Sequence, residues 1–142
     1  MRVVALVLLS VVAHPVGAAG EGSDWVEDSH VYATVANFSD ASIIAEGDAA
    51  LAPLGFQRES TGTTYPGGQV PGIFAFYKSG DLAAAMISQG SRAGCIVFST
   101  TNYDEHAAGL TKSAAAAIEA RFKKSFGDAL KLFSDGNCSH AL

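Results

Sequence analysis

The sequence predicts an α+β fold in two layers, in which a meander of about four antiparallel strands carries two helices side by side on one face. Short β-rich runs alternate with glycine-containing turns over residues 57–100, as expected for a meander. Apolar residues recur at helical spacing before and after this stretch. The chain of 142 residues has the length of one ordinary domain, which we place at residues 30–142.

Residues 1–19 (MRVVALVLLSVVAHPVGAA) have the pattern of a cleaved secretory signal peptide, with a positive charge at Arg2 and an apolar run over residues 3–13. A membrane anchor needs roughly 20 apolar residues. A lipoprotein needs a cysteine just after the cut, whereas the first cysteine is Cys95. The sequence therefore predicts export to the periplasm or extracellular space without stable membrane insertion. Residues 20–29 are expected to form a flexible acidic lead.

Residues 31–38 fit either a strand or a helix. Val31, Ala33 and Val35 alternate as in a strand, whereas Val31, Val35 and Phe38 share one helical face. The β-branched content favours a strand, which would add an edge to the sheet.

The first helix is expected to begin at Ser39 or Asp40, whose side chains can accept hydrogen bonds from the first turn. Pro53 and Gly55 close it, because proline lacks the donor and glycine tolerates a left-handed cap. The second helix is expected over residues 113–126 after a cap at Thr111, with its apolar residues spaced by four. Together the helices should bury Ile43, Leu51, Leu54, Ile118, Phe122 and Phe126 against the sheet.

Residues 128–133 leave two structures open after Gly127. The apolar stripe favours continuation of the helix through Ala129, Leu130 and Phe133. Alternatively, Leu130 and Leu132 alternate with Lys131 in a short strand.

The centre of the chain predicts a hairpin with Ser79 and Gly80 as a two-residue turn. That register places Lys78 opposite Asp81, a favourable charge pair. It also pairs Phe74 with Ala85 and Phe76 with Ala83.

A polar strand is expected over residues 57–64, an irregular turn cluster over 65–72 and a further apolar strand over 94–100. Both faces of the hairpin are apolar. One face must meet the helices, and the other is a candidate contact surface. The exposed face should bear either Phe74, Phe76 and Ile87 or Tyr77, Leu82 and Met86.

Two cysteines, Cys95 and Cys138, form an even pair in a chain predicted to be exported. An oxidising compartment makes a disulfide the default for such a pair. We therefore expect a bridge that ties the C-terminal tail to the sheet.

No residue pattern indicates a cofactor or metal site. The glycines of residues 65–72 precede a strand, whereas a phosphate-binding loop precedes a helix. His30, His106 and His140 are far apart and lack a second ligand at helical spacing. The net charge of −5 disfavours nucleic acid and anionic membranes as partners.

Two functions remain open. The favoured one is an exported, non-catalytic small domain that binds a protein partner or an envelope component, or forms a homodimer through a sheet face. The candidate interaction surface comprises Tyr77, Leu82, Met86, Tyr65 and Pro66. The alternative is a small hydrolase or thiol enzyme that uses Cys95 and His106, because a nucleophile needs a nearby base.

Overall fold

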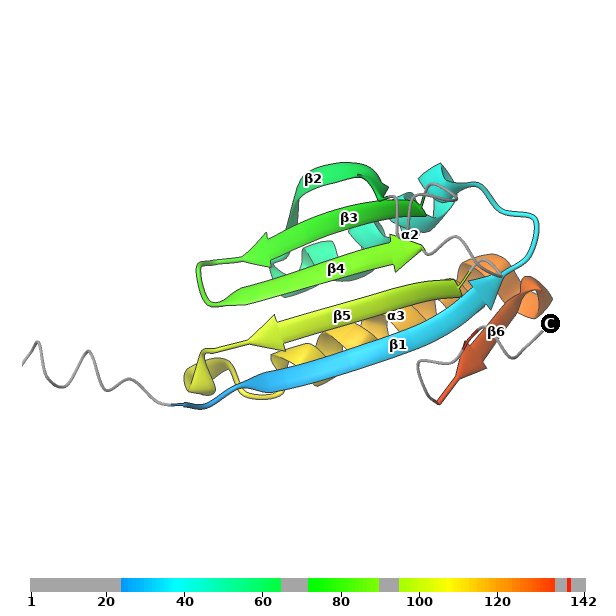
Figure 1. Cartoon of the computed structure of the whole chain (residues 1–142). Coiled ribbons are helices and arrows are strands. Elements are labelled where there is room, and N and C mark those ends of the chain that lie inside the picture. Colours follow the sequence, from blue (N-terminus) through cyan, green and yellow to red (C-terminus); the bar gives the residue numbers. More distant parts are fainter. Residues whose placement is uncertain (1–23, 65–71, 90–94, 135–137, 139–142) are drawn as a thin grey trace, which may run out of the picture.

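A computed structural model describes residues 24–64, 72–89, 95–134 and 138 of the chain (Figure 1). It confirms the α+β class with two α-helices and an antiparallel sheet, although the sheet has six strands rather than about four. The strands are β1 (Glu27–Val35), β2 (Gln57–Thr64), β3 (Gly72–Ser79), β4 (Ala83–Gln89), β5 (Cys95–Asn102) and β6 (Leu130–Phe133). The helices are α2 (Asp40–Leu51) and α3 (Leu110–Phe126), with short 3-10 turns η1 (Ala52–Leu54), η3 (Glu105–Ala107) and η4 (Gly127–Ala129).

The sheet has the strand order β2-β3-β4-β5-β1-β6. The expectation that the first strand forms an edge was wrong, because β1 pairs with β5 on one side and with β6 on the other. The strand also starts at Glu27, within the stretch expected to be a flexible lead. The expected signal peptide at residues 1–19 lies outside the described residues.

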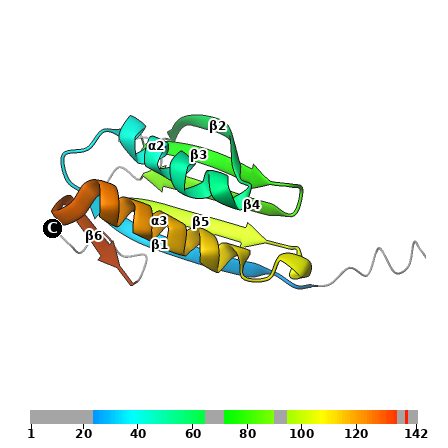
Figure 2. The same ribbon diagram turned by 180° about the vertical axis from the view of Figure 1, so that it is seen from behind.

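Both helices cover one face of the sheet, as predicted (Figure 2). Alternate residues of β1, β3, β4 and β5 turn toward them and form the core. Five of the six residues expected to be buried by the helices belong to this core, and the sixth, Leu54, is partly buried and packs against it. Among the described residues, no helix is long and apolar enough to cross a membrane.

Helix α2 lies unusually close to the sheet at Gly47. A Cβ at this position would lie 2.2 Å from Cδ1 of Ile87 and 3.0 Å from the Tyr77 hydroxyl. The next residue, Asp48, accepts a hydrogen bond of 2.9 Å from that hydroxyl and pairs with Arg58 at 3.2 Å. The absence of a side chain at Gly47 thus lets α2 dock directly on β3 and β4.

The hairpin β3–β4 has a different register from the predicted one. Ser79 pairs with Ala83 and Tyr77 with Ala85, so the loop contains three residues rather than two. Gly80 has a φ of 64° at the start of this loop, a value that glycine adopts without strain. Lys78 consequently faces Ala84 and not Asp81. Each residue of β3 thus lies opposite a β4 residue three positions later than predicted. Because three is an odd number, the predicted partners of Phe74 and Phe76 point to the opposite face of the sheet.

The segment after α3 is a strand, so the second of the two open alternatives is correct. Helix α3 ends at Phe126, where Gly127 follows with a φ of 51°. Residues Leu130–Phe133 then pair with β1 as β6.

Helix α3 receives its N-terminal cap from another element. The prediction that Thr111 caps it was wrong, because the helix begins at Leu110 after Gly109, which has no side chain to offer. The Glu27 carboxylate of β1 instead accepts hydrogen bonds from the backbone of Gly109 at 2.7 Å and of Thr111 at 2.8 Å. A carboxylate suits this end of a helix because unpaired N–H groups and the positive dipole end meet there.

Candidate interaction surface

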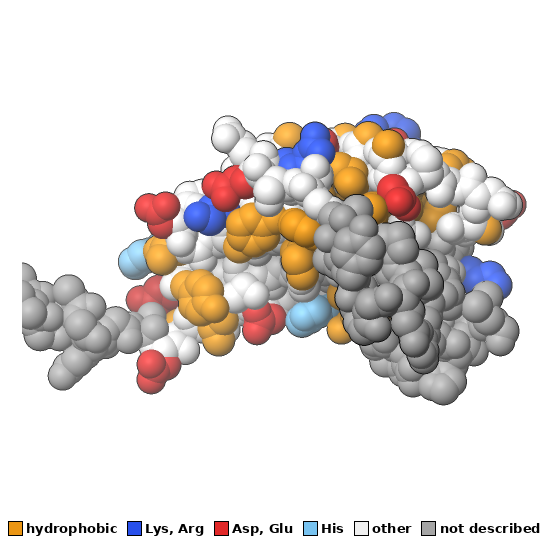
Figure 3. All heavy atoms as spheres, turned by 45° about the horizontal axis from the view of Figure 1, so that its top comes forward, with side chains coloured by type: hydrophobic (Ala, Val, Ile, Leu, Met, Phe, Trp, Pro, Cys, Tyr) orange, Lys and Arg blue, Asp and Glu red, His pale blue; other side chains and the backbone are white. Residues whose placement is uncertain are grey.

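The face of the sheet opposite the helices is the candidate interaction surface, and we call it the open face. Ala75 and Tyr77 are buried toward the helices, so Phe74 and Phe76 of β3 point to the other side. By the same alternation, the open face gathers apolar side chains from neighbouring strands: Phe74, Phe76, Met86, Val97 and Tyr32. In Figure 3, hydrophobic side chains lie together on this side of the molecule, with charged side chains around them.

Cross-strand pairing brings these apolar residues next to one another. Phe76 lies opposite Met86, and Val97 lies opposite Tyr32. Phe74 follows in the same row as Val97 and Tyr32, with the polar Ser88 between them, because Ser88 lies opposite Phe74 on one side and Val97 on the other. The result is an apolar strip that crosses the sheet from β3 to β1.

Some residues of the predicted interaction surface are exposed in the structure, and one of them is buried. Met86 and Leu82 are 38% and 49% exposed, Met86 on the open face and Leu82 in the hairpin loop. Tyr77 is not available for contact, because only 1% of it is exposed and it packs beneath α2. Tyr65 and Pro66 lie outside the described residues.

Each of the two groupings predicted for the exposed face combines residues that do not lie on the same face of the sheet. Ile87 and Tyr77 face the helices, whereas Phe74 and Phe76 share the open face with Met86. The open face therefore combines Phe74 and Phe76 from one predicted grouping with Met86 from the other. The missing signal was the length of the hairpin loop, which alone determines the pairing.

Burial raises the pKa of the Tyr77 hydroxyl well above its usual range, and the hydrogen bond to Asp48 adds to this effect. The group therefore stays protonated as a donor to α2. Its role is to hold the helix on the sheet.

Charged side chains border the open face at both ends of the apolar strip. Lys78 approaches Glu59 at 3.9 Å near β2. On the far side, Asp28 of β1 accepts a hydrogen bond of 2.6 Å from the Thr101 hydroxyl. A central apolar area with a polar rim is the usual composition of a protein–protein contact surface.

The predicted disulfide between Cys95 and Cys138 is present, with the two Cα atoms 5.4 Å apart. Cys95 lies opposite Thr34, so its side chain points to the open face. Cys138 is fully buried, with its sulfur 3.9 Å from the carbonyl oxygen of Ala33. The bridge thus fastens Cys138 to the end of β5 at one end of the open face.

The pair Cys95 and His106 is not assembled as a catalytic site. Cys95 is the first residue of β5, and His106 lies in η3 beyond the last residue of that strand. The strand separates them by roughly 20 Å. In addition, the sulfur of Cys95 is in a disulfide and has no thiolate to act as a nucleophile.

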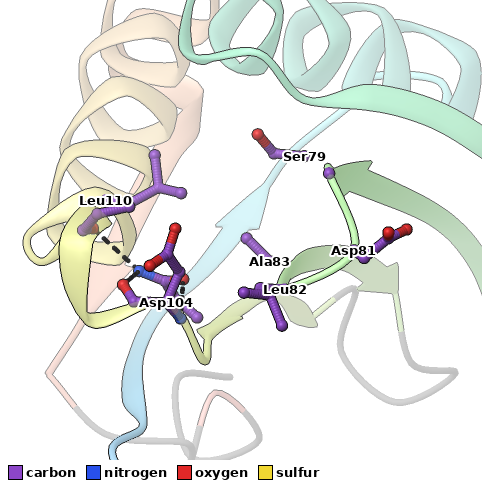
Figure 4. A pocket seen from close by; sticks show the side chains of 9 residues that line it. Ser79, Asp81, Leu82, Ala83, Asp104 and Leu110 are labelled. Carbon is purple, nitrogen blue, oxygen red and sulfur yellow. Dashed lines mark hydrogen bonds between the residues drawn. The ribbon is translucent and has the colours of Figure 1, made fainter. Parts of the chain in front are cut away.

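A small pocket of about 190 Å³ lies at the other end of the sheet (Figure 4). The hairpin loop, with Asp81 and Leu82, forms one wall, and Asp104 and Leu110 lie across from it. Ligand pockets usually have volumes of about 300–1,000 Å³. The pocket is therefore too small for a typical organic substrate.

Polar side chains in this pocket form hydrogen bonds with the backbone of the loop between β5 and α3. The fully buried Asn102 donates to the carbonyl oxygens of Asp104 and Ala107 and accepts from the Asp104 N–H at 2.9 Å. The Asp104 carboxylate accepts from the His106 N–H at 3.0 Å. These contacts give Asn102 a structural role.

Two carboxylates have a lowered pKa, and both connect elements of the fold. The Thr111 hydroxyl and the Gly109 N–H lower the pKa of Glu27 by hydrogen bonding to its charged form. The Arg121 guanidinium and then Ser125 lower the pKa of Glu46, which joins α2 to α3. Perturbed pKa values often mark catalytic sites, but neither carboxylate lines the pocket or faces another titratable acid.

Within the described ranges, no group of three histidine, cysteine, aspartate or glutamate side chains is arranged to hold a metal ion. A comparison with protein-family models finds no match, and a search of curated proteins finds none either. No functional residue is therefore carried over from a relative.

Proposed function

We propose that this protein is an exported, non-catalytic domain that binds a protein partner through the open face of its sheet. The observation that carries the proposal is the apolar strip formed by Phe74, Phe76 and Met86 with Val97 and Tyr32. Contiguous apolar surface on a small protein commonly marks a contact site.

Export is supported by the pattern of residues 1–19 and by the disulfide. Disulfides persist mainly in oxidising compartments such as the periplasm and the extracellular space. A partner in such a compartment would meet the open face with its central apolar strip and charged border.

A site-specific photo-crosslinking experiment tests the proposal. A photoreactive residue replaces Met86 on the open face or, as a control, Ala120, which is exposed on α3 on the opposite side. The chain is expressed in its native host and crosslinked there. We expect a discrete protein adduct from position 86 and none from position 120.

A second variant tests whether the apolar surface itself is needed. With the photoreactive residue at Phe76, Met86→Glu should strongly reduce the adduct, whereas Ala120→Glu should leave it unchanged. Because Met86 lies opposite Phe76, a new charge there would have to be buried in the contact. Equal adducts from positions 86 and 120, or none from position 86, would rule the proposal out.

A further inference from the structure

The outer edge of β1 is only partly paired in the described part of the chain. Strand β6 covers β1 from Tyr32 to Val35, whereas β5 covers the other side from Glu27 to Thr34. The segment Glu27–Val31 therefore has no neighbouring strand on its outer side among the described residues. Unpaired strand edges are sites at which another strand can add.

The backbone groups on this edge belong to the even-numbered residues. Ala36 donates its N–H to the carbonyl of Ala129 at 3.1 Å, which places the even positions of β1 on the β6 side. Because backbone groups alternate along a strand, the N–H and C=O groups of Asp28 and His30 point to the same side. These two residues thus offer donors and acceptors along the free segment.

We propose that a second copy of this chain binds here, with the two Glu27–Val31 segments paired antiparallel about a twofold axis at Ser29. This inference is independent of the proposed binding at the open face. The pairing joins the two sheets into one continuous sheet. Because paired residues in a ladder share a face, both open faces would lie on the same side of the dimer.

The ends of the free segment determine the register. The segment starts where β1 starts, at Glu27, and it ends at Val31, because Phe133 of β6 already pairs with Tyr32. Antiparallel pairing within these limits aligns Glu27 of one copy with Val31 of the other. Asp28 then lies opposite His30, and these are the residues whose backbone groups point outward. They can exchange both backbone hydrogen bonds.

The side chains are complementary in the same register. Asp28 and His30 are both exposed on the open face, so the carboxylate of each copy lies beside the imidazole of the other. The hydroxyl of Thr101 holds Asp28 at 2.6 Å, and the His30 ring stacks on Tyr32 with centroids 6.0 Å apart. A carboxylate directly across a strand pair from an imidazole can accept its N–H hydrogen bond, whereas two carboxylates in these positions repel each other.

The other edge of the sheet is less suited to strand addition. Strand β2 has a bulge between Arg58 and Ser60, and these residues and Glu59 are exposed. Bulges and charged side chains are the usual means by which sheet edges resist pairing.

Sedimentation equilibrium of the purified protein and three variants tests the dimer. We expect the wild-type chain to dimerise with a dissociation constant at or below about 1 mM. Asp28→His places two histidines opposite each other, and His30→Asp places two aspartates opposite each other. Each should weaken the dimer about tenfold, because the twofold axis applies every change twice.

The double variant D28H/H30D restores complementary pairs with the positions exchanged. Because it contains both single changes, it would also retain any destabilisation of the monomer that either change causes. Circular dichroism verifies that each variant folds. We expect its dissociation constant to return to within about threefold of the wild-type value. A monomeric wild type, single variants that dimerise normally, or a double variant as weak as the singles would each overturn the proposal.

Discussion

Replacing Gly47 with alanine tests how closely α2 approaches the sheet. On a solvent-exposed helix this change stabilises by about 1 kcal/mol, because alanine has the higher helix propensity. At Gly47, however, the new Cβ would lie 2.2 Å from Cδ1 of Ile87, and real Cβ atoms do not approach other atoms so closely. Ile87 is fully buried, so its side chain has little room to move away.

The two effects have opposite signs, and their sizes decide the outcome. Adding a methyl group to a well-packed core costs about 1–3 kcal/mol. After the gain in helix propensity, we expect G47A to lower the free energy of unfolding by about 1 kcal/mol. Ile87→Val removes Cδ1 and, as a typical change of this kind, costs about 1 kcal/mol by itself.

Combining the two substitutions isolates the contribution of the close contact between residue 47 and Ile87 from the other effects of each change on stability. In the I87V background the nearest obstructing atom is gone, and Cγ1 of residue 87 lies at an ordinary 3.7 Å from the added Cβ. The Tyr77 hydroxyl, at 3.0 Å, remains as the one tight contact of the added Cβ. G47A should then be close to neutral, because the gain in helix propensity offsets the remaining contact with Tyr77, which gives a coupling free energy of about 1 kcal/mol in the double-mutant cycle.

Urea unfolding of the four proteins measures this coupling. With a typical slope of about 2 kcal/mol per molar urea, a loss of about 1 kcal/mol lowers the midpoint by about 0.5 M. The reasoning fails if G47A stabilises the wild-type background or if the two changes are additive within about 0.5 kcal/mol. Either result would mean that α2 lies farther from β4 than the structure shows.

Two further predictions concern contacts that tie distant segments together. Glu27→Gln should lower the melting temperature near neutral pH, and the gap from the wild type should close in acid. The pKa of Glu27 is lowered in the folded state. The charged carboxylate therefore stabilises the fold above its unfolded-state pKa, and this stabilisation is lost as the pH falls through the folded-state pKa. A difference in melting temperature that does not change with pH would refute this role. Cys95→Ser combined with Cys138→Ser should lower the free energy of unfolding by up to about 4 kcal/mol, because the bridge joins residues 43 apart. Urea unfolding measures this loss, reduction of the wild type should reproduce it, and equal midpoints in all samples would contradict it.

Local patterns predicted the positions of both helices well. Ser39 caps α2 through the N–H of Ser42, as its place before the apolar repeat indicated. In α3, Ile118, Phe122 and Phe126 are buried because their spacing keeps them on one helical face. Each of these features depends on residues only a few positions apart.

Long-range pairing could not be predicted in the same way. The position of β1 inside the sheet depends on its ladder with β5, which is more than sixty residues away in the chain. The cap of α3 likewise comes from Glu27, distant in sequence, and not from the predicted Thr111. A single sequence contains no direct signal for either contact.

The composition of the open face depends on a single feature of the hairpin. A two-residue turn would have grouped Phe74 and Phe76 with Ala83 and Ala85, whereas the three-residue loop groups them with Met86. The same register places Tyr77 beside the buried Ala85, on the face where its hydroxyl reaches Asp48. The length of a solvent-exposed loop thus decides which side chains of β4 lie beside Tyr77 under α2 and which lie beside Phe74 and Phe76 on the open face. A change in the length of this loop should therefore disturb stability and binding together, because the same alternation of side chains determines both.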